Sequence, residues 1–324
     1  MHSRIMRLAS CRLHGIRAIL FLTLILFGGR AMAADRFLIS LPGPTLGYLP
    51  VYYGQEKGFF LQEGLDLQVL VVRGIIGVSS LMSGEVDVTC HAGSGFTAAL
   101  RGLPLKIISV TRDRPIHDLI VAPSISSPAD LKGKAVALGS LDGTSAVMIR
   151  RIFQAKGLDA QKDVTLLSMD THSRLQTLLT GKVAAAMLTS AASFVAQDQG
   201  YRLFARGRDY TRFLQIGVTT TDAAIKQKRE KIVRFLRGWN RASKFYQDNP
   251  EVMIPYIQKR LGIKDAQLAR RMYDDDAPYM LPGGRLSPEA AKEILDIGRE
   301  SLKIKEPVPL DRVFDFSLAA DASK

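Results

Sequence analysis

One short phrase occurs twice in this sequence, and the repeat limits the folds that the chain can adopt. Residues 83–88 read Ser-Gly-Glu-Val-Asp-Val and residues 180–185 read Thr-Gly-Lys-Val-Ala-Ala, at an offset of 181 − 84 = 97. An apolar segment at 37–41 falls on 134–138 at the same offset, and two further segments keep this register. Chance similarity between two β-α-β segments is the alternative, but the common register favours two related α/β lobes.

The stretch around the first copy is typical of a ligand-binding edge. Residues 86–90 alternate apolar and polar side chains, as a short strand does. Residues 91–95 read His-Ala-Gly-Ser-Gly, a helix opens at 96–100, and 105–110 is a second strand. A strand that leads through small residues into a helix leaves free backbone N–H groups at the helix N-terminus, where anions bind. We therefore expect a ligand-binding turn at 91–95.

The rest of the chain alternates strands and helices and then becomes helical. Strands are expected at 37–41, 65–72, 117–122, 134–138, 164–167, 183–188, 201–205 and 214–219, and helices at 48–58, 146–156, 173–179 and 191–199. After residue 221, helices are expected at 224–247, 250–261, 264–273 and 288–302, and the tail at 313–317 is expected to be a short strand or a loop. This order predicts the α/β class with a helical C-terminal third.

The composition is that of an ordinary globular protein. The 324 residues suffice for two domains, and 47% are hydrophobic and 23% charged. The formal net charge is +13, but the first 33 residues hold five arginines and no acid, so the remainder carries 39 basic and 31 acidic residues, or +8. This excess is scattered and forms no basic stripe with interleaved aromatic residues. Nucleic acid is therefore not an expected partner, whereas anionic solutes are favoured.

The first 33 residues resemble a cleavable signal peptide. Four arginines precede an apolar stretch at 18–27, and Ala31-Met32-Ala33 is a small-x-small cleavage site. The apolar stretch is too short for a transmembrane helix, although an uncleaved anchor is the alternative. Cleavage after Ala33 would deliver the protein to the periplasm with Cys90 as its one cysteine, without an internal disulfide. A buried, inert thiol is favoured for Cys90 over a nucleophile.

Several phrases carry a resemblance to a known family. Residues 52–60 read Tyr-Tyr-Gly-Gln-Glu-Lys-Gly-Phe-Phe, 63–66 read Glu-Gly-Leu-Asp, and 130–134 read Asp-Leu-Lys-Gly-Lys. With the two copies of the repeat, these phrases resemble the extracytoplasmic solute-binding proteins of ABC importers, in the nitrate/sulfonate/taurine and thiamine-precursor (NMT1-like) group. They follow the family order over about residues 37–205.

The resemblance implies a two-lobed, periplasmic-binding-protein-like type II fold of the α/β class. Two hinge strands would join the lobes, and a C-terminal helical segment would pack on lobe one. Lobe one would comprise residues 34–118 and 215–324, and lobe two residues 119–214. The resemblance also implies a monomer that closes on a small solute, without a cofactor, and that meets a membrane permease and its ATPase.

In this family, turns at the C-terminal ends of strands line the cleft, as in open α/β sheets generally. From lobe one the candidates are Pro44, Tyr48, Leu49, His91, Ala92, Gly93, Ser94 and Arg114, and from lobe two they are Gly143, Thr144, Ser145, Thr189 and Ser190. We expect these residues to face one another across the cleft.

Each candidate also has a purely structural interpretation. Residues 143–145 combine hydroxyls with the N–H groups of a helix start, which suits a sulfonate, carboxylate or phosphate oxygen but also describes an ordinary N-cap. His91 would donate to an anion or be a satisfied histidine at a strand end. Tyr48 would form an aromatic wall or belong to the core. Arg114, just before the first hinge strand, would reach the cleft or be solvated.

The sequence shows no catalytic or metal-binding pattern. His91, His117 and His172 are not at metal-ligand spacing, cysteines do not cluster, and neither a Gly-x-Ser-x-Gly elbow nor a P-loop occurs. The aspartate run at 274–276 would need further ligands to hold a metal, and a solvated turn is the alternative. We interpret the chain as a binding protein for a small organic anion, not as an enzyme. A pyrimidine (thiamine-type) precursor-binding protein or biosynthetic enzyme on the same fold is the competing interpretation.

Overall fold

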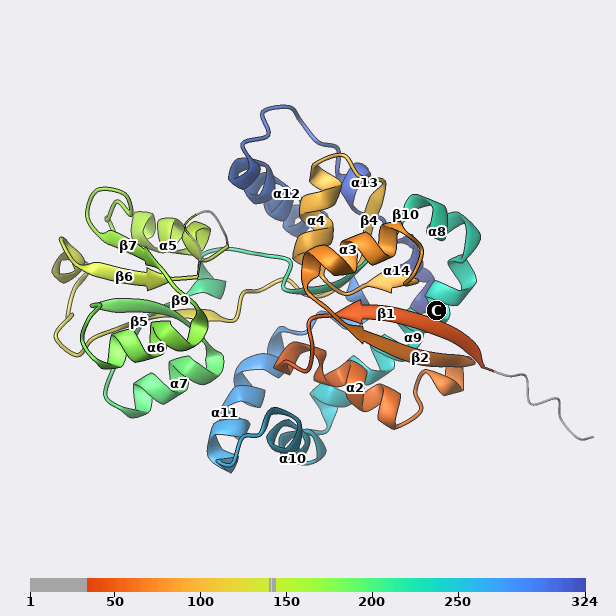
Figure 1. Cartoon of the computed structure of the whole chain (residues 1–324), viewed down its shortest axis with the longest axis horizontal. Helices are drawn as coiled ribbons and strands as arrows, with labels where there is room; N and C mark the ends of the chain where they lie inside the picture. The colour runs from red at the N-terminus through yellow and green to blue at the C-terminus, as the bar shows by residue number, and fades with distance from the viewer. Residues whose placement is uncertain (1–33, 140, 142–143) are drawn as a thin grey trace, which may run out of the picture. The chain divides into compact units, whose positions relative to one another are not determined.

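The structure is a computed structural model that describes residues 34–139, 141 and 144–324, so the expected signal peptide lies outside the described residues. Its strands form two five-stranded sheets (Figure 1). The first has the order β2-β1-β3-β10-β4, with β1 at Asp35–Leu41, β2 at Leu65–Val71, β3 at Val88–Thr89, β4 at Leu105–Arg112 and β10 at Ile216–Thr221. The second has the order β7-β6-β8-β5-β9, with β5 at His117–Val121, β6 at Ala135–Leu138, β7 at Thr165–Ser168, β8 at Ala185–Thr189 and β9 at Arg202–Arg206. We call the parts that carry these sheets lobe one and lobe two.

Helices connect the strands in both lobes and make up most of the C-terminal third. Lobe one carries α2 (Leu49–Glu56), α3 (Gly74–Met82) and α4 (Ala92–Leu100), and lobe two carries α5 (Thr144–Ala155), α6 (Thr171–Leu179) and α7 (Ser190–Asp198). The C-terminal third holds α8 (Asp222–Gln227), α9 (Arg229–Asp248), α10 (Pro250–Leu261), α11 (Ala266–Asp276), α12 (Pro288–Leu302), α13 (Leu310–Val313) and α14 (Ser317–Ala322). Short 3-10 turns lie at Leu46–Tyr48, Leu61–Glu63, Pro128–Leu131, Gly207–Asp209, Ala277–Tyr279 and Pro282–Gly284. Among the described residues, no helix is long and apolar enough to cross a membrane.

The two sheets have the same topology. In lobe one, β1 and β3 are parallel, and β10 runs antiparallel to both β3 and β4. In lobe two, β6 is parallel to β7 and β8, and β5 runs antiparallel to both β8 and β9. Each sheet therefore brings the C-terminal ends of most of its strands to one edge, with a single reversed strand next to the last.

The repeat in the sequence corresponds to this shared topology. Adding 97 to the bounds of α3, 74 and 82, gives 171 and 179, which are the bounds of α6. The same shift carries β3 onto the start of β8, and β4 onto the start of β9. The predicted pair of related α/β lobes is therefore present in the structure.

Apolar side chains cover both faces of the sheet in lobe one. Successive residues of a strand point to opposite faces, so Ile107 lies in the cluster with α3, α4 and α12 while Ile108 lies in the cluster with α2, α9 and α14. In the second cluster the rings of Phe37 and Phe235 stack at 4.8 Å, and Trp239 is 1% exposed. These layers fix the helix starts at the strand ends, where the candidate residues lie.

One expectation for the C-terminal third was wrong in detail, and two short helices, α13 and α14, were not expected. The single helix expected at 224–247 is divided at Lys228, whose φ of −124° is not helical, into α8 and α9. The short strand or loop expected at 313–317 is the connection between α13 and α14, where Phe314 makes an isolated bridge to Ile107. Short helices are hard to predict because tertiary contacts, not their own sequence, stabilise them.

Candidate functional site

The N-terminus of α3 lies open at the strand-end edge of lobe one. Arg73 occupies the N-cap position with an extended backbone (φ −73°, ψ 155°), but among the described residues no side chain caps this helix. The first N–H groups of a helix have no partner within the helix, and they carry part of its positive macrodipole. This end of α3 therefore attracts negative charge.

Two glycines of α3 make room for polar side chains at this helix end. A Cβ atom on Gly74 would lie 2.2 Å from Ser94 Oγ and 3.5 Å from His91 Nδ1. A Cβ atom on Gly77 would lie 2.4 Å from His91 Cδ2 and 2.9 Å from His91 Nε2. The absence of side chains at 74 and 77 thus lets an imidazole and a hydroxyl lie against the first turn of α3. We call Arg73, Gly74, Gly77, His91 and Ser94 the α3 cradle.

His91 is the buried titratable group of this cradle. Its side chain is 6% exposed, and its Nε2 atom has no hydrogen-bond partner among the described residues. Burial lowers the pKa of His91 below its usual value of about 6.5, so the ring is neutral at pH 7 and has one N–H to donate. A buried polar atom without a partner costs about 1–3 kcal/mol, which an oxygen atom of a ligand would recover.

A groove of about 620 Å³ opens beside the cradle, between α3 and α4. Ile75 of α3, Gly93 and Ser94 of α4, and Phe213 of the connection from lobe two line it. Ile75 is 76% exposed, so this groove has an apolar wall next to the polar cradle. Three of the predicted site residues, His91, Gly93 and Ser94, therefore lie together.

The other candidates of lobe one lie elsewhere. Tyr48 is 4% exposed, its hydroxyl donates to the Cys90 carbonyl oxygen at 2.7 Å, and burial raises its pKa. Leu49 and Ala92 are also buried in the core, whereas Pro44 is exposed. Tyr48 thus ties the first turn to the central strand and is not an aromatic wall of the cleft, because its hydroxyl has its partner inside the lobe.

In lobe two, the turn after β6 closes on itself. Ser145 is 8% exposed, and its Oγ atom accepts a hydrogen bond from the Gly139 backbone N–H at 3.2 Å. Thr144 is the first residue of α5, and Gly143 lies outside the described residues. Arg174 of α6 lies beneath this turn: it is 4% exposed and donates from Nη1 to the Met187 carbonyl oxygen at 2.6 Å.

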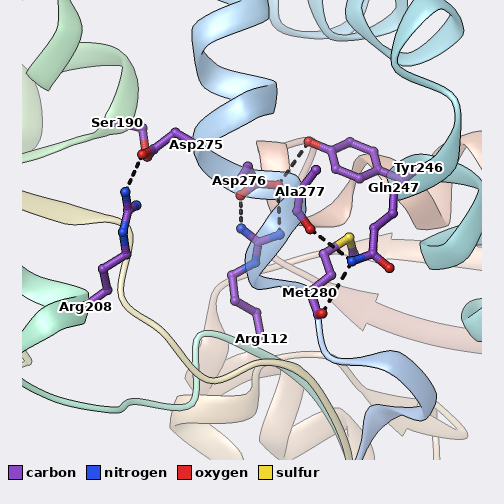
Figure 2. Close-up of polar contacts among 9 residues, drawn as sticks. All are labelled: Arg112, Ser190, Arg208, Tyr246, Gln247, Asp275, Asp276, Ala277 and Met280. Atoms are coloured by element: carbon purple, nitrogen blue, oxygen red, sulfur yellow. Dashed lines mark hydrogen bonds and ion pairs between the residues drawn. The ribbon is translucent and has the colours of Figure 1, made fainter.

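Ser190 takes part in a contact between lobe two and α11. It is 5% exposed and donates to Asp275 Oδ2 at 3.4 Å, and Asp275 also accepts from Arg206 Nη1 at 2.8 Å and Arg208 Nη2 at 2.5 Å. Figure 2 shows Arg208, Ser190 and Asp275 converging. Burial alone would raise the pKa of Asp275, but the hydrogen bonds and charges of Arg208 and Arg206 outweigh it and lower the pKa. We call Ser190, Arg206, Arg208 and Asp275 the seam.

The residue after Asp275 points into lobe one. The Asp276 carboxylate accepts hydrogen bonds from Nη1 and Nη2 of Arg112 and, at 3.0 Å, from the Tyr246 hydroxyl. Figure 2 shows these contacts on the side of α11 that faces away from Asp275 and Arg208. Asp274 pairs with Arg270 at 3.1 Å. The aspartates at 274–276 thus form the last turn of α11 and are held by ion pairs. No group of three His, Cys, Asp or Glu residues in the described part of the chain could hold a metal ion.

Arg114 and Thr189 remain at the margins of these clusters. Arg114 donates from Nη1 to the Arg208 carbonyl oxygen at 2.9 Å, which links the two chain segments that cross between the lobes. Thr189 is half-buried at the N-cap of α7, where its side chain makes no capping hydrogen bond. The predicted site residues therefore do not form one constellation: some lie at the cradle, the turn after β6 or the seam, and the others lie outside these clusters.

The chain matches the family described as NMT1/THI5 like over residues 46–253, more than half of its length. It belongs to the NMT1/THI5-like family. A curated relative, 4-amino-5-hydroxymethyl-2-methylpyrimidine phosphate synthase from Uromyces fabae, is 32% identical over 111 residues, which are 32% of this chain. The chain spans about a third (33%) of the length of this relative.

Solved structures share the fold of this NMT1/THI5-like chain at low sequence identity. The periplasmic aliphatic sulphonate binding protein SsuA from Escherichia coli has a TM-score of 0.73 and 18% identity, over 88% of this chain and 99% of that one. A mutant of the desulfurization enzyme DSZB in complex with biphenyl-2-sulfinic acid has a TM-score of 0.64 and 15% identity, over 90% of this chain and 99% of that one. The predicted two-lobed, type II periplasmic-binding-protein fold is thereby confirmed.

Several residues of these clusters were missing from the sequence-based set. Gly74 and Gly77 had a visible signal, because two glycines in the first turn of a short helix are costly unless something packs against them. Arg174 and Asp275 had none, since a charged residue on a helix is usually solvated. Their partners Met187 and Arg208 lie 13 and 67 residues away in the sequence.

Proposed function

We propose that this NMT1/THI5-like protein is a periplasmic solute-binding protein that captures a small organic anion between its lobes and delivers it to an ABC permease. The observation that carries this proposal is the α3 cradle, in which the Ser94 hydroxyl lies against Gly74 at an uncapped helix N-terminus and the buried imidazole of His91, with an unpartnered Nε2 atom, lies against the same helix turn. Lobe one would comprise residues 34–118 and 215–324, lobe two residues 119–214, and the protein would act as a monomer after cleavage behind Ala33.

The cradle suits an oxyanion because it offers donors and no carboxylate. The first N–H groups of α3, one imidazole N–H and the Ser94 hydroxyl can each donate to a separate oxygen atom of a sulfonate or carboxylate. The apolar Ile75 and Phe213 next to them suit the hydrocarbon part of such a solute. The ligands named with the two structural neighbours, an aliphatic sulphonate and a sulfinic acid, belong to the same chemical class.

A thiamine-type pyrimidine is the competing solute, and its synthesis is the competing function. The synthase from Uromyces fabae favours it, although that match covers a third of each chain. Against a thiol-dependent enzyme stands Cys90, the residue before His91, which is fully buried and whose pKa burial raises. A thiol held in its neutral form is a poor nucleophile.

The test is a binding screen of the purified protein by calorimetry and thermal shift. The probes are methanesulfonate, benzenesulfonate, benzoate, nitrate and 4-amino-5-hydroxymethyl-2-methylpyrimidine. We expect the organic oxyanions to bind and to be recovered unchanged. His91→Ala and Ser94→Ala should each weaken binding about tenfold, since each removes a hydrogen bond of about 1.4 kcal/mol to a charged group.

Ser83→Ala is the matched control, because Ser83 lies at the other end of α3 and bonds within that turn. It should bind the probes like the wild type. Conversion of a probe to a product would replace the transport function with an enzymatic one. Wild-type affinity in both His91→Ala and Ser94→Ala would remove the cradle from the site.

A further inference from the structure

A second, smaller pocket lies on the opposite side of the first turn of α4 from the cradle. Its volume is about 140 Å³. Its apolar walls come from three helices: Phe96 and Leu100 of α4, Ile294 and Ile297 of α12, and Val147 of α5. Figure 1 shows α4 and α12 side by side, which agrees with their contacts. A cavity of about this size lined by aliphatic and aromatic side chains accepts one benzene ring.

The small pocket and the groove beside the cradle meet at three residues. Gly93, Thr97 and Phe213 line both. Gly93 lies two residues after His91 and directly before Ser94, so the boundary of the pocket is next to the donors of the cradle. Arg212, the one charged side chain among the residues that line the pocket, is tied to Asp113 and, at 3.3 Å, to Glu293. The passage itself is thus bordered by uncharged groups.

Packing does not require a glycine at position 93. Its φ is not in the left-handed region, and a Cβ atom would lie 3.5 Å from Phe213 Cζ, an ordinary contact. By contrast, a Cβ atom on Gly95, two residues later in the same helix, would lie 2.3 Å from Thr219 Oγ1. A glycine inside a helix costs about 1 kcal/mol relative to alanine. At position 93 the chain bears this cost, and the missing side chain leaves a space that any larger residue would fill.

We propose that Gly93 determines solute specificity, because it leaves a passage from the α3 cradle into the pocket between α4 and α12. This inference rests on the proposed function and narrows the solute to an organic anion with one aromatic ring or a short alkyl chain. The anionic head binds at the cradle, and the apolar part passes Gly93 and lies between Phe96 and Ile297. Small inorganic anions would leave the pocket empty.

The test compares methanesulfonate with benzenesulfonate by calorimetry on the wild type, Gly93→Ala and Gly93→Leu. The wild type should bind benzenesulfonate at least tenfold more tightly than methanesulfonate. Gly93→Leu should lose this preference, and Gly93→Ala should retain most of it. Ile297→Ala, at the far wall of the pocket, should weaken benzenesulfonate binding alone, and it provides the test if Gly93→Leu does not fold.

The outcomes separate this inference from the proposed function. Equal affinity of the wild type for the two sulfonates, or an unchanged preference in Gly93→Leu and Ile297→Ala, would overturn the role of Gly93 while anion binding stands. Failure of the wild type to bind either sulfonate would overturn the proposed function, and the specificity inference with it.

Discussion

Lobe one and lobe two share their strand order and strand directions, but they place different side chains at equivalent points of the strand-end edge. At the offset of 97 the equivalent pairs are Arg73 and Asp170, Gly77 and Arg174, His91 and Leu188, and Ser94 and Ala191. Lobe one has an uncapped helix and hydrogen-bond donors at these points, whereas lobe two has a capped helix, apolar side chains and a buried guanidinium. The topology is thus independent of the binding chemistry, which depends on a few side chains in one lobe.

The reversed strands show the same contrast. Gly217 of β10 makes a bridge with His91, whereas Asp118 of β5 pairs with Leu188. Each lobe therefore has one buried titratable group at this point, but lobe one carries it on the central strand and lobe two on the reversed strand. Asp118 accepts a hydrogen bond from Ser193 at 2.9 Å, so its polar group is satisfied within its own lobe. The His91 Nε2 atom has no such partner among the described residues.

The largest expected effect on stability comes from replacing Arg174 of lobe two with glycine, the residue at the equivalent position 77 of lobe one. Arg174→Gly should lower the free energy of unfolding by about 2–4 kcal/mol, because it removes the donor to the Met187 carbonyl, empties the space under the turn after β6 and adds a helical glycine. Urea unfolding measures this loss. Arg174→Met, which keeps the length of the side chain, should cost about half as much. A loss below about 0.5 kcal/mol in Arg174→Gly would show that the guanidinium does not support lobe two.

The next largest effect is the pH dependence of stability that the buried carboxyl group of Asp118 in lobe two should produce. Burial raises the pKa of Asp118 from 3.8 to about 6, against the lowering effect of its hydrogen bond from Ser193. The folded protein therefore holds this proton more tightly than the unfolded chain, so this carboxyl group destabilises the fold above pH 6 and the cost disappears as the pH falls toward 4. Relative to Asp118→Asn, the wild type should gain roughly 2 kcal/mol between pH 7 and pH 4.5.

Chemical unfolding of both proteins at a series of pH values measures this difference. Asp118→Asn is the suitable reference because an amide oxygen can still accept the hydrogen bond from Ser193. Parallel stability curves for the two proteins over this range would show that the pKa of Asp118 is not raised. The buried titratable groups of the two lobes would then not be comparable.

A substitution at Gly77 tests the contrast between Gly77 and Arg174 from the side of lobe one. Gly77→Ala should destabilise the protein by about 1–2 kcal/mol, because the new Cβ atom would lie 2.4 Å from the His91 ring and 2.9 Å from Ser40 Oγ. Gly93→Ala, where the Cβ contact is ordinary, should be neutral or slightly stabilising and serves as the control. Thermal unfolding should show that most of the loss vanishes in a His91→Ala background. An equal loss in both backgrounds would mean that Gly77 does not make room for the imidazole.

The strands of both lobes could be predicted from local pattern, and the binding clusters only in part. The expected strand at 105–110 and the observed β4 at Leu105–Arg112 differ by two residues, because apolar runs bounded by glycine and proline mark strands directly. The rule that ligands lie at strand ends selected His91, Gly93 and Ser94, which lie together beside the groove. It also selected Tyr48, because a turn sequence does not show which side chain points inward.

Long-range pairs were beyond prediction. Ser190 was selected as a ligand-binding residue, but it bonds with Asp275, 85 residues later in the sequence. Adjacent aspartates at 275 and 276 point to different lobes, and nothing in the local sequence distinguishes them. Their partners depend on how α11 lies between the two lobes, which only the assembled fold determines.

The smallest effect on stability concerns the two helix starts. In lobe two, Asp170 caps α6 by accepting from the backbone N–H groups of His172 and Ser173, both at 3.0 Å, whereas Arg73 provides no such cap for α3. Arg73→Asp should therefore stabilise the protein by at most about 1 kcal/mol, and Asp170→Ala should destabilise it by about 1 kcal/mol.

The stabilising substitution Arg73→Asp should nevertheless weaken benzenesulfonate binding more than tenfold, because the new carboxylate would occupy the anion site and repel the sulfonate. Arg73→Ala, which removes the charge without adding a cap, should weaken binding less. Thermal unfolding and calorimetry on the same variants measure both quantities. Unchanged anion affinity in a stabilised Arg73→Asp protein would show that the start of α3 is merely an uncapped helix, and the functional difference between the lobes would have to lie elsewhere.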